Sequence, residues 1–243
     1  MERVRYRIMT RLARRPVFAM PLARLRGEGE LVARDTDLLI ESFPRSASSF
    51  ALAAFNVAQE PARLKVAHHT HAPGHVIAAI RLGVPTLVLV RDPEGAVISS
   101  MIRHPGRTCA GVLRGYVDFH EPLLPYRGDL VVGTFAEVVG GEVGRITRRV
   151  NARFDTAFAE FEPTEDNVAR CLREIDEDWR ERRGGGEHLE RIVPRPSAMR
   201  DGMKDEFRDR YRREVPAALR ERAERLYGAF APADADAGAG ERP

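Results

Sequence analysis

A short segment rich in serine, residues 44–49, has the residue types that bind a phosphate group. It reads Pro44-Arg45-Ser46-Ala47-Ser48-Ser49 and lies between an apolar run, residues 37–43, and a segment of helical spacing, residues 50–57. A helix N-terminus offers unpaired backbone N–H groups and about half a positive charge, and small side chains let an anion approach. Arg45 would add a fixed cation. The segment lacks the G-x-x-x-x-G-K-[ST] pattern, which argues against an ordinary ATPase or GTPase.

The same serines have a simpler interpretation. Ser46, Ser48 and Ser49 could merely cap the helix, since serine is favoured at helix starts for its local hydrogen bonds. Residues 44–49 taken alone fit a cap and a phosphate cradle equally well.

A second group of polar residues follows the apolar run at residues 86–90. Arg91-Asp92-Pro93 leave this run, and Ser99 lies eight positions after Arg91. An arginine at the carboxyl end of a parallel strand points into the crevice where α/β proteins bind ligands, and its guanidinium can hold a phosphate through two parallel hydrogen bonds. The alternative is that Arg91 pairs with Asp92 in a solvated turn, which is common for exposed arginines.

Together, the two segments resemble the cofactor motifs of sulfotransferases. PRSASSF is similar to the motif that binds the 5′-phosphosulfate of 3′-phosphoadenosine 5′-phosphosulfate (PAPS), and VLVRDPEGAVISS is similar to the motif that binds its 3′-phosphate. The resemblance implies that PAPS is the cofactor and that Arg91 and Ser99 hold the 3′-phosphate. It assigns the 5′-phosphosulfate to the first motif, Arg45, Ser46, Ala47, Ser48, Ser49 and Phe50.

Between the two motifs lies a histidine-rich stretch, His68-His69-Thr70-His71. Sulfotransferases that act on small hydroxyl acceptors carry a similar Lys-Thr-His element here, and the resemblance makes His71 the base that removes the acceptor proton. An imidazole with an ordinary pKa of about 6.5 can accept a proton near neutrality. H-H-x-H lacks the cysteines or the helical i, i+4 pair of a zinc site, so we expect no metal and interpret His68 and His69 as structural or solvent-facing.

The chain departs from the family pattern at three places. Arg45 replaces a lysine found in many members, so it can stabilise the leaving phosphate oxygen but cannot protonate it. Ala47 stands where glycine is usual, which costs roughly 1 kcal/mol if the position needs a positive φ. The late loop that closes over the nucleotide is replaced by a basic stretch, residues 195–204, in which Arg200 is the candidate contact.

Alternating strands and helices should position these residues. The pattern predicts strands at residues 37–43, 64–67, 86–90 and 130–135, the third of them in mid-sheet, and helices at residues 50–57, 74–82 and 94–102, with Gly83 capping the second helix. Strands separated by helices imply a parallel sheet. We therefore expect an α/β, P-loop-type sulfotransferase fold, followed by charged helices at residues 142–154, 165–182 and 205–230 with a glycine break at 184–186.

Length and charge set the remaining expectations. The 243 residues carry 39 basic and 36 acidic side chains. We expect one domain over 1–231, with an N-terminal basic segment 1–34, a helical cap at about 140–231 and a disordered tail at 232–243. Two cysteines, no membrane-spanning run and no secretory signal favour a cytoplasmic protein with membrane contact unexpected. Basic residues interleaved with acidic ones argue against nucleic-acid binding.

The leading functional hypothesis is a PAPS-dependent sulfotransferase that acts on a hydroxyl or amine of a small-molecule or carbohydrate acceptor. The alternative is a catalytically inactive, sulfotransferase-like nucleotide-binding or scaffold protein. A kinase is a third hypothesis, but neither a P-loop lysine nor a magnesium ligand is evident. The acceptor and the oligomeric state stay open.

Overall fold

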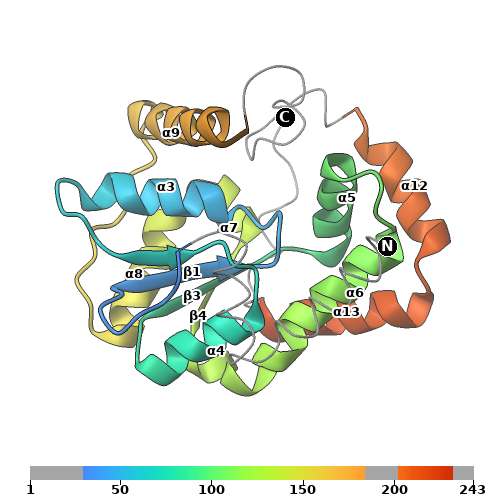
Figure 1. Cartoon of the computed structure of the whole chain (residues 1–243), viewed down its shortest axis with the longest axis horizontal. Coiled ribbons are helices and arrows are strands. Elements are labelled where there is room, and N and C mark those ends of the chain that lie inside the picture. Colours follow the sequence, from blue (N-terminus) through green and yellow to red (C-terminus); the bar gives the residue numbers. More distant parts are fainter. Residues whose placement is uncertain (1–29, 184–201, 232–243) are drawn as a thin grey trace.

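The computed structural model describes residues 30–183 and 202–231 (Figure 1). The described core is a four-stranded parallel sheet in the order β2-β1-β3-β4. The strands are β1 (Leu38–Ser42), β2 (Val66–His68), β3 (Thr86–Val90) and β4 (Val131–Thr134). All residues of β1 and β3 are buried, as expected for strands that are covered on both faces.

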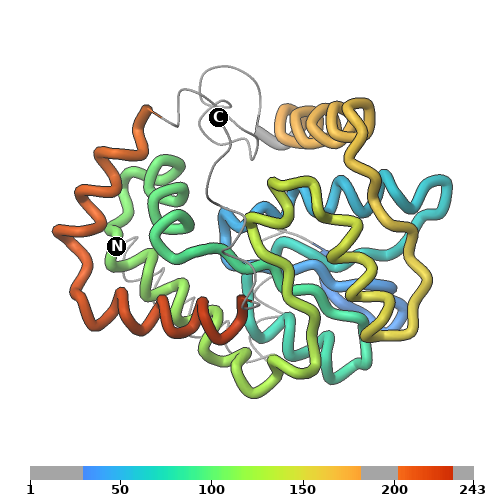
Figure 2. Tube along the Cα trace, turned by 180° about the vertical axis from the view of Figure 1, so that it is seen from behind, coloured from blue at the N-terminus to red at the C-terminus, as the bar shows by residue number. Residues whose placement is uncertain are grey.

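Helices cover both faces of the sheet. One face packs against α3 (Ser48–Gln59) and α8 (Val143–Phe154), and α9 (Glu165–Arg183) lies on the outside of α3 (Figure 1). The other face packs against α4 (Pro73–Leu82), and α5 (Pro93–Arg103) and α6 (Cys109–His120) extend the hydrophobic core on that side. α12 (Lys204–Glu214) and α13 (Ala217–Phe230) lie on the outside of α5 and α6, as both views of the chain show (Figures 1 and 2). The predicted α/β class with a helix-flanked parallel sheet is confirmed.

Most predicted elements lie within two residues of their predicted bounds. β3 agrees fully and lies in mid-sheet, and Gly83 ends α4 in the left-handed conformation, with its N–H donating to the carbonyls of Ala79 and Ile80. α3 begins two residues earlier than predicted, at Ser48. The strand predicted at 130–135 ends at Thr134, because Thr134 and Glu137 form a capping box that starts α7 (Phe135–Val139).

The single helix predicted at residues 205–230 is wrong. The chain has two helices there, because Val215 is extended (φ −97°, ψ 122°) and Pro216 follows it. A residue before proline is driven out of the helical region by the proline ring. The bend lets α12 pack against α5 while α13 packs against α6.

Sequence reasoning missed α6 and the 3-10 helix η1 (Glu121–Asp129) that follows it. A signal was present, since Thr108 accepts a hydrogen bond from Gly111 N–H as an N-cap, and Val112, Tyr116 and Phe119 follow at helical spacing. The glycine break at 184–186, the terminal segments 1–29 and 232–243, and Arg200 lie outside the described residues. The division into one domain, a cap and a tail stays a prediction.

Candidate functional site

The carboxyl ends of β1, β2 and β3 bring the predicted site residues to one edge of the sheet. β1 leads into residues 44–49 and α3, β2 leads into the histidine-rich stretch, and β3 leads into Arg91 and α5. In parallel sheets this edge is where ligands bind.

The turn before α3 leaves its helix N-terminus open. Ala47 is the N-cap and no side chain caps the helix, so the interpretation of the serines as simple caps is wrong. The first intrahelical bond runs from Ala51 N–H to the Ala47 carbonyl (3.1 Å), which leaves the N–H groups of residues 48–50 without an intrahelical acceptor. The first turn carries no acidic residue. These are the features that let a helix start bind an anion.

Ser46 is the most enclosed residue of this turn. Its side chain is fully buried, and its Oγ has no hydrogen-bond partner. A buried hydroxyl without a partner costs about 1–3 kcal/mol, so one that persists requires an explanation. An anion seated on the turn would supply the missing acceptor.

Arg45, Ser99 and Arg91 lie in contact although they come from three places in the sequence. Arg45 Nε donates a hydrogen bond to Ser99 Oγ (3.0 Å). Arg91 Nη1 donates to the carbonyl oxygen of Arg45 (2.9 Å). The structure therefore joins the two predicted cofactor motifs into one cationic cluster.

Arg91 is held by two aromatic residues that sequence reasoning missed. Its guanidinium carbon lies 3.8 Å from the centroid of the Phe135 ring, and Tyr116 Oη donates to its backbone carbonyl (2.9 Å). No sequence pattern linked either residue to Arg91, because the contacts are made between separate elements. Phe135 therefore holds the guanidinium of Arg91, and Tyr116 holds its backbone.

Arg91 faces Asp92 as an ion pair, as the alternative interpretation predicted, but the arginine is buried and not in a solvated turn. The Arg91 side chain is only 14% exposed, and its Nε, which lies 3.8 Å from Asp92 Oδ2, has no hydrogen-bond partner. Asp92 instead accepts a hydrogen bond from Gly95 N–H as the N-cap of α5. Burial lowers the pKa of Arg91, while the nearby charge of Asp92 raises it. A buried arginine with a free donor is suited to an anionic ligand.

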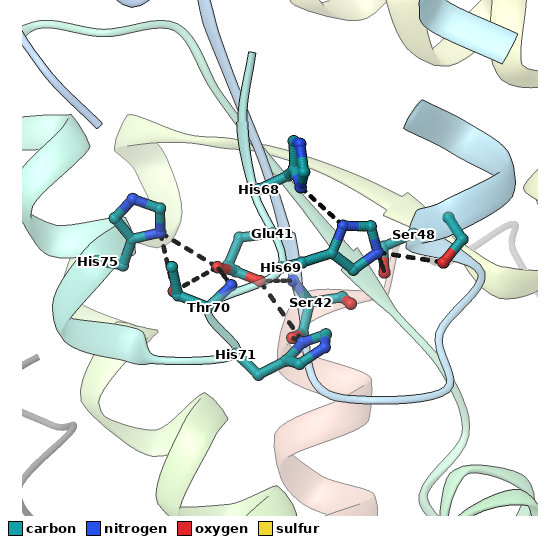
Figure 3. A network of polar contacts seen from close by, with 9 residues as sticks. Glu41, Ser42, Ser48, His68, His69, Thr70, His71 and His75 are labelled. Carbon is teal, nitrogen blue, oxygen red and sulfur yellow. Dashed lines mark hydrogen bonds and ion pairs between the residues drawn. The ribbon is translucent and has the colours of Figure 1, made fainter. Parts of the chain in front are cut away.

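His69 lies against the turn, although sequence reasoning assigned it no role. Its Nε2 is 3.1 Å from Ser49 Oγ and 3.5 Å from Ser48 Oγ, and its Nδ1 is 2.8 Å from Nδ1 of His68 (Figure 3). The two serine hydroxyls that do not cap α3 thus face an imidazole. Within the described residues no group of three or more histidine, cysteine or acidic side chains could hold a metal ion.

His71 lies beside this cluster, at the end of β1. Its Nδ1 donates to the backbone carbonyl of Ser42 (2.8 Å) and is 3.6 Å from Oε1 of Glu41 (Figure 3). The His71 and His69 rings meet edge to face, with centroids 5.7 Å apart. The side chain of His71 is 29% exposed. His71 therefore meets the site through its ring contact with His69.

Glu41 is the functional candidate that sequence reasoning did not find. It is fully buried in β1, where its carboxylate meets Thr70, His71 and His75. Burial by itself would raise the pKa of Glu41, but hydrogen bonds from His75 and Thr70 and the neighbouring His71 imidazole lower it to about 2. An acidic residue inside an otherwise apolar strand, LLIES, was the available signal.

Two other predicted residues are less closely engaged. Phe50 turns its ring into the core under α3, against Phe161 at 6.3 Å between centroids, so it could serve an anion only through its backbone N–H. Arg200 lies outside the described residues.

Comparison of the sequence with protein-family models and with curated proteins gave no match. Nineteen chains of solved structures match the fold. One is mouse sulfotransferase SULT7A1 complexed with PAP, at 12% sequence identity and a TM-score of 0.41, over 80% of this chain and 90% of that chain. At so low an identity and TM-score, the likeness carries no argument about the function of this chain. None of its described helices is long and apolar enough to cross a membrane.

Proposed function

We propose that this protein is a sulfotransferase that moves a sulfuryl group from PAPS to a hydroxyl or amine of a small-molecule or carbohydrate acceptor. The observation that carries the proposal is the cationic cluster of Arg45 and Arg91 at the open N-terminus of α3, beside a partly exposed histidine. Cationic side chains gathered at a helix N-terminus attract an anionic ligand, because opposite charges stabilise each other.

The residues present fit a nucleotide with two phosphate-type groups. The uncapped start of α3, the unpartnered Ser46 Oγ and the side chain of Arg45 provide donors for one anionic group. Arg91, with an unpartnered Nε, and Ser99 provide donors for a second. PAPS would supply the activated sulfuryl group when bound.

The side chains then divide the remaining tasks. Arg45 neutralises charge that develops on the leaving phosphate oxygen, which an arginine can do without losing a proton. His71 accepts the proton of the acceptor at Nε2, since Nδ1 is already engaged with Ser42. As in phosphoryl transfer, catalysis is positioning plus electrostatics, and one well-placed donor contributes about 3 kcal/mol.

Calorimetric titration tests the cofactor site. The wild-type protein should bind 3′-phosphoadenosine 5′-phosphate (PAP) more tightly than AMP, which lacks the 3′-phosphate. Arg91→Ala should weaken PAP binding by about 1.5–3 kcal/mol, or roughly 10- to 100-fold, and close the gap between PAP and AMP, because a charge-assisted bond to the 3′-phosphate is lost.

Arg81→Ala is the matched control. Arg81 is an exposed arginine in the last turn of α4, and its loss changes the net charge equally. This variant should retain the difference between PAP and AMP. If folded wild-type protein binds neither nucleotide, the proposal fails.

If PAP binds, the next experiment is an acceptor screen that follows the transfer of labelled sulfate from PAPS to phenols, sugars and amines. His71→Ala is tested in parallel and should lose transfer. Tight binding of PAP without transfer to any acceptor would favour the inactive nucleotide-binding or scaffold protein.

A further inference from the structure

The buried carboxylate of Glu41 lies next to the proposed base and has no role in the proposed function so far. It comes from the middle of the sheet, one residue before the end of β1, and is fully buried. A charge in such a place is costly unless hydrogen bonds and an opposite charge compensate it.

Hydrogen bonds hold both carboxylate oxygens in place. Oε2 accepts from the backbone N–H of Thr70 (3.0 Å) and from its hydroxyl (2.7 Å). Oε1 accepts from the backbone N–H of Ser42 (3.1 Å) and faces Nδ1 of His71 at 3.6 Å. The carboxylate is therefore fixed with one oxygen toward Thr70 and the other toward His71 (Figure 3).

His75 also contacts Glu41 but carries no charge. The backbone N–H of Val32 donates to His75 Nε2 (2.9 Å), so that nitrogen must keep its lone pair. The proton of His75 then sits on Nδ1, which lies 2.9 Å from Thr70 Oγ1 and 3.2 Å from Glu41 Oε2. A neutral imidazole with one N–H donates a hydrogen bond and cannot balance the carboxylate charge.

His71 is the remaining partner that can become positive. Its Nδ1 lies 2.8 Å from the Ser42 carbonyl, which can only accept, so Nδ1 carries a proton. In the neutral imidazole Nε2 is then unprotonated. Nε2 has no hydrogen-bond partner among the described residues. It is also not buried, so its lone pair is open to solvent.

We propose that Glu41 is a positioning residue for His71, with the Ser42 carbonyl as its second anchor. Together they hold the imidazole with its proton on Nδ1 and its Nε2 lone pair toward the acceptor, and the carboxylate stabilises the imidazolium that forms. The inference rests on the proposed sulfotransferase function.

The proposed step balances without any further reactant. The acceptor oxygen or nitrogen forms a new bond to sulfur. The bond from sulfur to the phosphate oxygen breaks, and its electron pair stays on that oxygen. The acceptor's proton goes to Nε2 of His71, and the proton on Nδ1 stays in place between the imidazole and its two oxygen partners.

Nitrogen-15 NMR of histidine-labelled protein tests the proposal without any transferase activity. Ring nitrogen shifts, recorded well above the ordinary histidine pKa of about 6.5, report which nitrogen carries the proton. The His71 signal, assigned by its loss in His71→Asn, should show the Nδ1–H tautomer in wild-type protein. Glu41→Gln should lower the Nδ1–H fraction below that of wild type, although the Ser42 carbonyl still favours this tautomer, because the Thr70 donors retain the amide oxygen and turn the amide NH₂ toward His71 Nδ1.

Thr70→Val is the control. It removes a hydrogen bond to the same carboxylate but leaves Glu41 beside His71, so the Nδ1–H tautomer should persist. An equal shift in Thr70→Val and Glu41→Gln would overturn the proposal, since Glu41 would then act only through general packing. If Glu41→Gln does not fold, the wild-type spectrum still tests the proposal, because a His71 that carries its proton on Nε2 would contradict it.

The catalytic readout separates this proposal from the proposed function. With an acceptor found in the screen, Glu41→Gln should lower kcat at least about 100-fold with little change in KM, as expected for an impaired general base. In a His71→Ala background the same change should have no further effect on kcat. Wild-type protein that shows the Nδ1–H tautomer but transfers no sulfate would refute the proposed function and leave the Glu41–His71 arrangement standing.

Discussion

Backbone conformations that are unusual for side-chain-bearing residues gather at the site. Five non-glycine residues in the described chain have a positive φ, and four of them, Arg45, Ala47, His69 and His71, lie at the carboxyl edge of the sheet. Left-handed conformations cost of order 1–3 kcal/mol each outside glycine, and such strain is found where function requires a fixed geometry. The clustering supports the assignment of the site independently of the resemblance to sulfotransferases.

Ala47 offers a direct test of this strain. At φ 66° and ψ 18° its Cβ crowds the backbone, and glycine has no Cβ. We expect Ala47→Gly to raise the free energy of unfolding by about 1 kcal/mol, measured by urea denaturation. Ala58→Gly in the last turn of α3 is the control and should lower it, by up to about 1 kcal/mol, because glycine disfavours helical backbone relative to alanine. A loss of stability in Ala47→Gly would show that the turn is not strained.

At the scale of elements, the ends of β1, β2 and β3 each provide one part of the candidate site. β1 provides Glu41 and Ser42, β2 the histidines, and β3 Arg91, whose backbone is anchored by Tyr116 of α6. The outermost strand, β4, packs closely against α8. A Cβ added to Gly133 of β4 would lie only 2.8 Å from Ile146 of α8.

The docking of α8 depends on a glycine. A Cβ at Gly144 would lie 2.6 Å from the backbone oxygen of Phe161, and backbone cannot move aside as a side chain can. Gly144→Ala should therefore destabilise the protein by about 1–2 kcal/mol, as overpacking outweighs the better helix propensity of alanine. Gly106→Ala, where a Cβ would meet nothing within 4 Å, should change the free energy of unfolding, measured by urea denaturation, by less than about 0.5 kcal/mol. Equal effects of the two variants would contradict this account.

At the scale of the whole molecule, His120 joins segments that lie far apart in the sequence. Its ring packs against Tyr116 of its own helix, Phe43 after β1 and Phe230 of α13. It is fully buried, and its Nε2 has no hydrogen-bond partner. Burial lowers the pKa of His120 to about 4, and the hydrogen bond to the Tyr116 carbonyl offsets this only in part.

This histidine should make the fold sensitive to mild acid. Between pH 6.5 and about 4 the unfolded chain binds a proton that the folded chain rejects, so stability falls as pH falls through this window, by at most about 3 kcal/mol. His120→Phe should flatten the stability curve there, measured by urea denaturation at successive pH values. Glu41, with a pKa lowered from 4.5 to about 2, adds a separate loss below pH 4.5 that the variant should retain. If the free energies of unfolding of wild type and His120→Phe fell in parallel as the pH is lowered, His120 would not be the cause of the acid sensitivity.

Local patterns in the sequence were sufficient to predict the α/β class and to find the two segments that resemble cofactor motifs. Short apolar runs such as residues 86–90, closed by proline or by charged residues, predict buried parallel strands because the signal lies within a few neighbouring residues. The same locality placed Arg45, His71 and Arg91 just after strands and Ser99 in the helix that follows β3, and strand ends of a parallel sheet share one edge. The break of the last helix at Pro216 was also locally encoded, but the regular charge pattern on both sides concealed it.

The tertiary structure alone decided which of these residues meet. The contacts of Arg45 with Ser99, of Arg91 with Phe135 and Tyr116, and of Glu41 with His71 join residues that lie 54, 44, 25 and 30 positions apart, respectively. Such pairs depend on strand order and helix packing, which no single segment encodes. The sequence by itself determined that a serine-rich turn, an arginine and a histidine each follow a strand, because those signals are local, and the folded chain determined that a buried carboxylate lies beside that histidine.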